Sequence, residues 1–532
     1  MKPKTSLLAH LFQALYNPTK PSLLLSITLY LGLMNGLWVG QSAWWVMIAW
    51  VVLMTPFLWL PARGFKVWLS VQLLIASVAL FVKSRYQVLI SEDILLSALL
   101  SEADLTAEMF SWQGIVFVSL VAGIPMVVMS RLKLKALSWQ SLLKQSALLL
   151  LGGLLLIAVI FHHHDYHFRD KGHIRDSRFM SDVFTFSPVD ALYNFHRAYK
   201  SLKKMKRDYL QVEDLTQRYH YQSQVEDLLV VVVLGESTRG DHFSLLGYPK
   251  QTNPRLSKIP DLYPFLATSC DTLTINSLHC LASPLLAKEQ GRSVKQSSFG
   301  QIFRYLGYQT HIYSLQTLSG FYAYLGYDTL ISKYQITAEQ ADGARDRALL
   351  PYVLKAIASY QGGKQLIIAH TLGSHQTYAD RINPNLIPFQ PYCQKPDVAE
   401  CSREDLGRAY DNTVVAVDDF LADIIEALRP HKALLLYVSD HGESLGEDGH
   451  YFHGQPVQTA PKEQFSIPMV WWFSESYRNS EQGALLVEKI KQAFEQKLLL
   501  SHDEVFHSIL GCAGVVSYDG GLEPHLNLCH LD

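Results

Sequence analysis

Residues 228–237, LLVVVVLGES, form an apolar, β-branched run that ends in an acid and a serine. A continuous run of this length predicts a strand buried on both faces, as in parallel sheets that helices cover on each side. Residues 364–375 (KQLIIAHTLGSH) and 433–444 (ALLLYVSDHGES) repeat the pattern, with helical stretches between them. We therefore expect an α/β domain with a central, mostly parallel sheet in residues 226–532.

Polar side chains end all three predicted strands. The first strand ends at Glu236, the second stretch ends at His375, and the third is followed by Asp440, His441 and Glu443. Ligands of open α/β sheets bind outside the carboxyl ends of the strands, so these side chains are expected to share one crevice. Glu236, Asp440 and His441 offer two carboxylates and an imidazole, a set that suits Zn²⁺ with one position left open. Taken singly, they could be a surface acid, a helix cap and its neighbour.

A second chemical feature is the stretch 269–280, SCDTLTINSLHC, in which two cysteines enclose several hydroxyl groups. From Thr274 onward the apolar residues have helical spacing, so a helix is expected to start there. A threonine is a weak nucleophile until it loses its proton, which coordination to Zn²⁺ promotes, and a helix start favours an incoming phosphate. The alternative is that Thr272 and Thr274 only cap a disulfide loop.

All six cysteines lie in the second half of the chain. They are Cys270, Cys280, Cys393, Cys401, Cys512 and Cys529. Successive pairs are separated by 10, 8 and 17 residues, which favours three local disulfides in an oxidising compartment. Buried free thiols are the alternative, and the absence of a CxxC motif argues against a zinc ribbon.

The apolar residues are concentrated in residues 1–162. Of the 532 residues, 49% are hydrophobic and 18% charged, which is more apolar than an ordinary soluble protein. A helix crosses a bilayer with about 20 apolar residues, and five stretches approach this length: 22–40, 43–61, 66–83, 113–130 and 144–162. A cleavable signal peptide would be followed by soluble chain, so we predict a five-helix membrane anchor.

Positive charges predict the orientation of this anchor. Lys and Arg gather before the first span and in the second and fourth connections, at Lys2, Lys4, Lys20, Arg63, Lys66, Arg131, Lys133, Lys135 and Lys144. Such residues stay on the cytoplasmic side, so the N-terminus is expected there and the chain after residue 162 outside. The outer connection 84–112 has the apolar spacing of an amphipathic helix on the membrane surface.

The net charge of the whole chain is -2, so the protein has no overall basic field that would attract nucleic acid.

Residues 163–225 are predicted to be a linker. Ser187 and Pro188 predict the start of a helix, whose basic end could be solvated or could contact anionic headgroups: Lys203, Lys204, Lys206 and Arg207. A histidine cluster at the membrane exit could bind metal, although an interfacial position is the simpler interpretation: His162, His163, His164 and His167.

Six stretches carry a family resemblance. They are VVLGESTRGDHFSLLGY, SCDTLTINSLHC, GSH at 373–375, AYDNT at 409–413, SDHGESLGE and HGQPVQTAPKEQFSIPMVWW. In this order, over most of residues 228–532, the chain resembles the membrane-anchored phosphoethanolamine transferases of Gram-negative inner membranes. These belong to the alkaline-phosphatase/sulfatase-like superfamily, and the five predicted spans match their architecture.

Within this family the chain is most similar to the branch that modifies the Kdo sugar of lipopolysaccharide. The form SCDT-x-T-x-x-SL-x-C and the C-terminal GC, DGG and CH elements carry that similarity. The lipid A-directed branch tends to have GETAR, SCGT and VPCMF, where this chain has GESTR, SCDT and LHCLA. Leu281 and Ala282 depart from the Met-Phe pair common in both branches, which leaves the acceptor open.

The resemblance implies a role for each candidate site residue. Thr274 would be the nucleophile and would share a tightly bound zinc ion with Glu236, Asp440 and His441. Two further histidines, His375 and His453, would bind a second zinc ion during turnover or transfer protons. Glu443 would not bind the metal itself but would lie next to the residues that do. The disulfide pairings implied by the family would be Cys270–Cys280, Cys393–Cys401 and Cys512–Cys529.

The reaction implied is a two-step transfer in the periplasm. Thr274 would attack phosphatidylethanolamine, release diacylglycerol and form a phosphoethanolamine-threonine intermediate, which a hydroxyl of the Kdo sugar of Kdo2-lipid A would then take up. The enzyme would be a multi-pass monomer of the inner membrane, where tethering concentrates it near lipid substrates. Alternatives are transfer to a lipid A phosphate, a metal-dependent phosphatase or sulfatase, a glycerophosphate transferase and an inactive membrane sensor. No CxPxR-like sulfatase motif surrounds Thr274.

Overall fold

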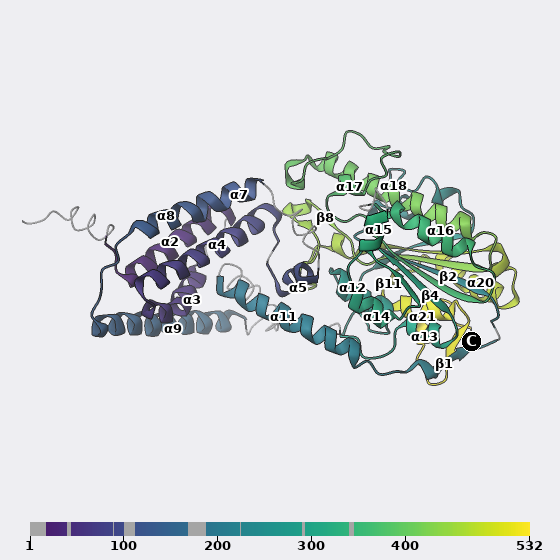
Figure 1. Ribbon diagram of the computed structural model, residues 1–532, viewed down its shortest axis with the longest axis horizontal. Helices are drawn as coiled ribbons and strands as arrows, with labels where there is room; N and C mark the ends of the chain where they lie inside the picture. Colours follow the sequence, from purple (N-terminus) through teal and green to yellow (C-terminus); the bar gives the residue numbers. More distant parts are fainter. Residues whose placement is uncertain are drawn as a thin grey trace, which may run out of the picture. The chain divides into compact units, whose positions relative to one another are not determined.

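The chain forms two compact units, which are described separately. The computed structural model describes residues 17–39, 44–88, 90–100, 112–168, 188–223, 225–289, 293–339 and 345–531. Unit 1 comprises Met1–Leu95 and Phe110–Ala198, and unit 2 comprises Leu96–Met109 and Tyr199–Asp532 (Figure 1). The expected boundaries at residues 162 and 225 remain predictions.

Unit 1 is helical, with apolar side chains both inside and outside. Its main elements are α2 (Lys20–Val39), α3 (Trp44–Met54), η1 (Thr55–Trp59), α4 (Ala62–Tyr86), α7 (Trp112–Val118), η2 (Ser119–Gly123), α8 (Ile124–Arg131) and α9 (Trp139–Phe168). In α4, Leu69 and Leu73 are fully buried, whereas Val67 is 63% exposed. An apolar outer surface is expected of helices that face lipid.

Three helices among the described residues are long and apolar enough to cross a membrane: Ala62–Tyr86, Trp112–Arg131 and Trp139–Val159. The predicted span 22–40 coincides with α2, but that helix does not meet the same criterion over its described residues. In the span 43–61 the α-helix ends after 11 residues and tightens into η1, where Pro56 lacks an N–H for regular helical bonding. A membrane-like helical unit is therefore supported, and five spans are not confirmed.

The two predicted connecting helices are found in part. In the segment 84–112, α4 continues to Tyr86 and α5 spans Glu92–Leu100; residues 101–111 lie outside the described part of the chain. The linker helix α11 (Pro188–Leu210) begins at the proline, as predicted. The side chains of residues 160–192 are not described, so the metal hypothesis for the histidine cluster stays a prediction.

Unit 2 is built on an eight-stranded sheet with the order β11-β3-β10-β7-β2-β6-β4-β5. The strands are β2 (Leu228–Gly235), β3 (Leu262–Thr268), β4 (Gln309–Ser314), β5 (Thr329–Ile331), β6 (Lys364–His370), β7 (Ala433–Ser439), β10 (Ser466–Phe473) and β11 (Leu500–Ser501). Both pairings of β10 are antiparallel and all other pairings in this sheet are parallel. The sheet is therefore mixed, and mostly parallel as predicted.

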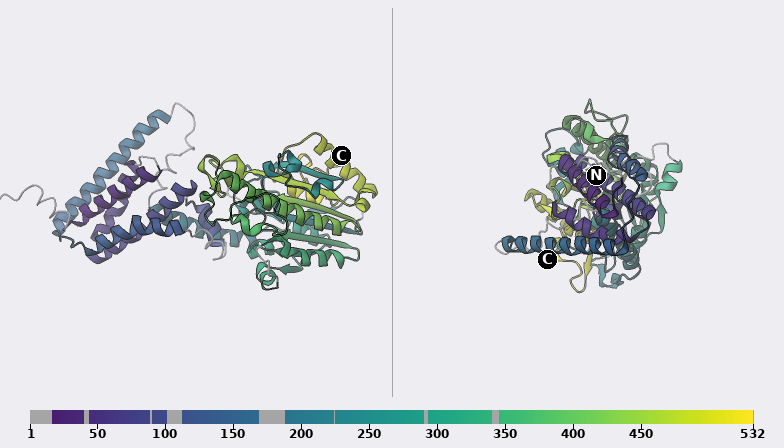
Figure 2. Two further views of the ribbon diagram at one scale, coloured as in Figure 1. Left: turned by 90° about the horizontal axis from the view of Figure 1, so that it is seen from above. Right: turned by 90° about the vertical axis from the view of Figure 1, so that its left-hand side faces the viewer.

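Helices cover both faces of this sheet, whose strands run side by side in the left view of Figure 2. Figure 1 shows α16 (Leu350–Ala358) and α18 (Arg403–Leu428) on one side, and α12 (Thr274–Ala282) and α21 (Asp503–Gly511) on the other. Alternate residues of β2 pack into two separate apolar cores, so every residue of that strand is buried. Burial on two faces explains the unbroken run of valine and leucine.

The structure forms three disulfides, and each joins two cysteines that follow one another in the order of the chain. They are Cys270–Cys280, Cys393–Cys401 and Cys512–Cys529. The spacing argument and the family pairing both predict these bonds, which lie entirely in unit 2.

Candidate active site

The carboxyl ends of three central strands bring the predicted site together. In the sheet β2 lies between β6 and β7, parallel to both, with Leu234 opposite His370 and Gly235 opposite Ser439. The strands therefore end almost level. Glu236 and Asp440, which follow β2 and β7, emerge side by side as the sequence pattern predicts.

The turn after β2 is held by contacts from three directions. Ser237 has a φ of 55°, a left-handed conformation that few residues other than glycine adopt. Its N–H donates to Asp440 Oδ1 (3.0 Å), its hydroxyl donates to Glu236 Oε1 (2.8 Å), and its carbonyl accepts from the Tyr410 hydroxyl (2.5 Å). A backbone state that is intrinsically unfavourable by about 1–3 kcal/mol persists because these contacts determine it.

Thr274 points into this group of acids. It is the first residue of α12, and its hydroxyl donates to Glu236 Oε2 (3.2 Å) and lies 3.3 Å from His441 Nε2. Thr272 points elsewhere, because its hydroxyl donates to the Gln455 carbonyl (2.6 Å). The geometry thus distinguishes two threonines that local sequence left equivalent.

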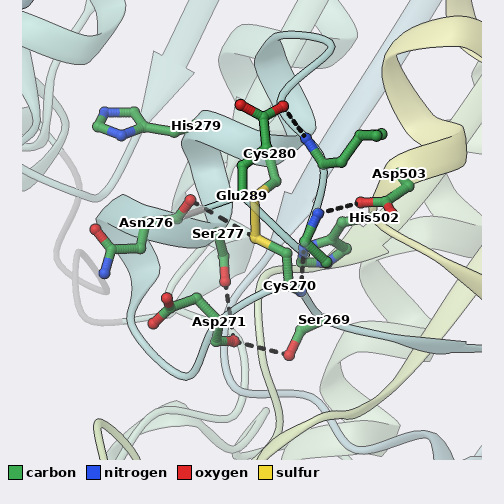
Figure 3. The surroundings of a disulfide bond; sticks show 12 residues. Ser269, Cys270, Asp271, Asn276, Ser277, His279, Cys280, Glu289, His502 and Asp503 are labelled. Carbon is green, nitrogen blue, oxygen red and sulfur yellow. Dashed lines mark hydrogen bonds between the residues drawn. A yellow bond between two sulfur atoms is a disulfide. The ribbon is translucent and has the colours of Figure 1, made fainter. Parts of the chain in front are cut away.

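The remaining hydroxyls of the 269–280 stretch stabilise its backbone. Ser269 and Ser277 both donate to the Asp271 carbonyl, at 2.8 and 3.1 Å (Figure 3). The Cys270–Cys280 disulfide closes the same loop. Thr274 is therefore held at the edge of a cross-linked, hydrogen-bonded turn.

His441 presents one ring nitrogen to the carboxylates. Its Nδ1 lies 2.9 Å from the Gly442 carbonyl, so the proton resides on Nδ1 and the Nε2 lone pair is free. Nε2 lies 3.3 Å from both Glu236 Oε1 and Asp440 Oδ2. Burial lowers the pKa of His441, although Asp440 acts against this, so the imidazole is kept neutral. Residue 442 must be small, because a Cβ there would lie 2.1 Å from the Glu463 carbonyl oxygen.

The site has the chemistry of a cation site. Glu236 and Asp440 are 1% and 0% exposed, and burial together with the charge of Asp440 raises the pKa of Glu236 well above its usual value. Asp440 Oδ2 has no hydrogen-bond partner among the described residues. Glu236, His441 and His453 each place a potential ligand atom within 4.8 Å of the others. One carboxylate and two imidazoles at this separation, with Asp440 Oδ2 3.3 Å from His441 Nε2, fit Zn²⁺.

His453 and His375 form the second half of the site. The rings of His453 and His441 are 4.1 Å apart between centroids, and those of His453 and His375 are 5.3 Å apart. Burial opposes a charge on His453, but the Glu443 carboxylate, 2.8 Å from Nδ1, outweighs it and raises the pKa. Burial and then His453 lower the pKa of His375. Glu443 also accepts from the Tyr378 hydroxyl (3.2 Å), which fixes its orientation.

Sequence reasoning missed Gln316. Its side-chain N–H groups donate to Glu236 Oε2 (3.0 Å) and to the Thr371 carbonyl (3.2 Å), so it links the loops after β2 and β6. Gln316 lies two residues beyond the end of β4, next to β6 in the sheet. A polar residue just after a strand is the signal that could have found it, as for Glu236 and Asp440.

Asp346 was also missed. Its buried carboxylate accepts N–H bonds from Leu372 (2.7 Å) and Gly373 (3.1 Å) and so holds the loop that carries His375. Burial raises the pKa of Asp346 to about 6. Gly373 has a φ of 49°, and a Cβ there would lie 2.3 Å from the Glu236 carbonyl oxygen. No short motif connects Asp346 with this loop.

Residues 229–515 match the family model described as Sulfatase. The chain belongs to the sulfatase family. Residues 46–201 of this sulfatase-family chain match the model described as Phosphoethanolamine transferase EptA/EptB. The resemblance to phosphoethanolamine transferases is thereby confirmed.

Three named proteins are similar to this chain, one in sequence and two in fold. The sulfatase-family chain is 33% identical over 318 residues to the Kdo(2)-lipid A phosphoethanolamine 7''-transferase of Escherichia coli K12, covering 59% of this chain and 56% of that protein. Its fold matches the integral membrane lipooligosaccharide phosphoethanolamine transferase A of Neisseria meningitidis, with a TM-score of 0.76 and 23% identity over 90% of this chain and 88% of that one. It also matches the C-terminal periplasmic domain of Escherichia coli EcEptC in complex with Zn, with a TM-score of 0.50 and 22% identity over 59% and 88%.

Proposed function

We propose that this protein transfers phosphoethanolamine from phosphatidylethanolamine to lipopolysaccharide, with the Kdo sugar of Kdo2-lipid A as acceptor. The observation that carries the proposal is the position of Thr274, whose hydroxyl faces Glu236 and His441 at a buried pair of carboxylates. A hydroxyl held at a cation site is equipped to act as a nucleophile. Similarity to the Kdo(2)-lipid A transferase of Escherichia coli supports this choice of acceptor.

Zinc is the cofactor proposed for this site. Glu236, Asp440 and His441 would hold it together with Thr274, and His453 is close enough to take part. When bound, the ion supplies positive charge for a hydroxyl that must lose its proton and for phosphoryl oxygens that gain charge. The zinc complex of the related EcEptC domain supports the choice of metal.

In the first step, Thr274 Oγ attacks phosphorus and the bond from phosphorus to the diacylglycerol oxygen breaks. The threonine hydroxyl points its proton at Glu236 Oε2, 3.2 Å away. His453 can hold a proton for the departing alkoxide, because the neighbouring Glu443 carboxylate raises its pKa against the effect of burial. The product is a phosphoethanolamine ester of Thr274 and free diacylglycerol.

In the second step, an acceptor hydroxyl attacks the same phosphorus and Thr274 leaves. His375 suits the accepting role, because its lowered pKa keeps the imidazole neutral. The 5.3 Å between the His375 and His453 ring centroids is short enough for both rings to contact one phosphate, which supports these two roles. Thr274 Oγ takes back from Glu236 the proton that it gave up in the first step, and the proton accepted by His375 replaces the one that His453 gave to diacylglycerol. One phosphorus–oxygen bond is therefore exchanged in each step and both protons are accounted for.

The proposed setting follows from the substrates. Donor and acceptor are both lipids, so a membrane anchor raises their effective concentration at the site. We place the N-terminus in the cytoplasm, the residues from 226 onward in the periplasm of a Gram-negative cell, and the active form as a monomer. The disulfides of unit 2 support an oxidising compartment.

Mass spectrometry of lipopolysaccharide tests the proposal. Cells that express the wild type should carry one added phosphoethanolamine on the Kdo region, Thr274→Ala should abolish it, and Thr272→Ala should retain it because Thr272 faces Gln455. An adduct on a lipid A phosphate would move the acceptor to that alternative. Release of free phosphoethanolamine without an adduct would indicate a hydrolase instead.

A further inference from the structure

We propose that His502 is a positioning residue for the reaction, because its ring joins the segment that carries Thr274 to the strand that carries Asp440. The ring is completely buried. Its Nδ1 accepts the N–H of Cys270 (3.2 Å), and its Nε2 lies 3.0 Å from the Ser439 carbonyl (Figure 3 shows the ring beside Cys270). The inference rests on the proposed role of Thr274.

One tautomer satisfies both contacts. A backbone N–H can only donate and a carbonyl can only accept, so the ring proton resides on Nε2 and Nδ1 presents its lone pair. Each contact is made with the segment that carries a proposed reacting or metal-holding group. Cys270 precedes Thr274 by four residues, and Ser439 directly precedes Asp440.

The two hydrogen bonds of His502 connect the segment after β3 with β7, and these two strands are not neighbours in the sheet. In the strand order, β10 separates β3, which leads to Cys270, from β7, which ends at Ser439. Met469 of β10 is paired with Val438, so the next residue in this register is Pro468, which has no N–H to offer Ser439. His502 supplies that donor instead from the far side of β3.

The backbone of His502 is itself well anchored. Its N–H donates to the Thr268 carbonyl (3.1 Å), which continues the parallel pairing of β11 with β3. The ring is therefore presented from a fixed position just before α21. A rigid imidazole that forms one hydrogen bond with each segment sets the distance between Thr274 and the Asp440–His441 pair.

Replacing His502 should affect two properties separately. Asn places its oxygen near the position of Nδ1 and keeps the Cys270 contact, whereas Gln places its nitrogen near Nε2 and keeps the Ser439 contact. His502→Asn should therefore release the metal-holding strand and lose zinc to a chelator more readily. His502→Gln should retain zinc but orient Thr274 poorly, and slow its modification by about 100-fold, as expected for a displacement near 1 Å.

The experiment uses full-length protein in detergent with zinc and phosphatidylethanolamine. It measures the rate of phosphoethanolamine attachment to Thr274, the zinc retained after dialysis against a chelator, and the thermal unfolding midpoint. His507→Ala is the matched control, because His507 is 1% exposed and its Nδ1 accepts the N–H of Glu523, outside the site. It should lower the midpoint and leave both other readouts within about twofold of wild type.

The inference is supported if His502→Asn and His502→Gln show the opposite defects described. It is overturned if both variants match His507→Ala in attachment rate and zinc retention. If the wild type forms no adduct, the proposed function fails, while zinc retention by His502→Asn still decides whether His502 holds the strand.

Discussion

At the scale of single residues, the candidate site gathers two acidic side chains and an imidazole away from solvent. Glu236 and Asp440 are buried next to each other, and His441 presents a lone pair rather than a proton to them. Two buried carboxylates repel each other, so cation binding between them should stabilise the folded protein.

Gln316→Leu tests how the orientation of Glu236 is set. Its amide donates to Glu236 Oε2 and to the Thr371 carbonyl, and the loss of a hydrogen bond to a charged group is worth about 1.5–3 kcal/mol. We expect the modification of Thr274 to slow by about tenfold or more. The rate is measured with full-length protein and phosphatidylethanolamine at saturating zinc.

A second buried glutamine provides the control for this variant. Gln365 is 8% exposed and donates to the Ala356 carbonyl. Gln365→Leu should lower stability without slowing the reaction. An equal effect of both substitutions on the rate would show that Gln316 acts only through stability.

At the scale of elements, α12 owes its position to the loop that precedes it. The Cys270–Cys280 disulfide joins the start of that loop to the last turns of the helix. Removing a cross-link over 10 residues is expected to lower stability by about 3 kcal/mol through loop entropy.

The double variant Cys270→Ser, Cys280→Ser should therefore unfold at a lower temperature and also react more slowly at Thr274. The double variant Cys393→Ser, Cys401→Ser removes a cross-link over 8 residues and should lose a similar amount of stability with no change in rate. Thermal unfolding and adduct formation are measured on both. Equal rates in the two variants would contradict a role for the first disulfide in placing Thr274.

Asp346→Asn tests the loop between β6 and His375 through pH. Burial raises the pKa of Asp346 to about 6, above its value in the unfolded chain. Between about pH 4 and pH 6 the folded protein therefore binds more protons than the unfolded chain, and this carboxyl makes the wild type lose stability as pH rises. The variant lacks that loss, so its stability relative to wild type should rise by about 2 kcal/mol from pH 4 to pH 7.

Thermal unfolding of both proteins across this pH range provides the measurement. A constant difference between variant and wild type would mean that Asp346 is ionised at all these pH values. In that case the N–H groups of Leu372 and Gly373 would compensate fully for burial.

The strand ends show what local pattern could and could not predict. Glu236, Asp440 and His441 follow continuous apolar runs, and that signal is local, so their convergence could be predicted. The contributions of Gln316 and His502 depend on which loops meet across the sheet, and a single polar residue carries no such information. Thr274 could be separated from Thr272 only by the family resemblance or by the structure, because both suit the start of a helix.

At the scale of the whole molecule, composition separates an apolar helical unit from an α/β unit, and the structure has both. The mostly parallel sheet could be predicted from the buried runs, whereas the antiparallel direction of β10 could not, because a buried strand has the same composition in either direction. Hydropathy alone does not determine the number of spans, since it does not register where Pro56 ends a helix.

The compartment of unit 2 can be tested through its thiols. All six cysteines are paired in the structure. If this unit lies in the periplasm, alkylation of protein from intact cells should label no cysteine before reduction and six after it. Labelling before reduction would place the unit in the cytoplasm.

The central claim is that Thr274 carries the transferred group, and peptide mapping of the full-length protein tests it most directly. After incubation with zinc and phosphatidylethanolamine, without acceptor, the peptide with Thr274 should gain the mass of one phosphoethanolamine group, and Thr274→Ala should gain none. Adduct on another residue, or an unchanged adduct in Thr274→Ala, would contradict the account.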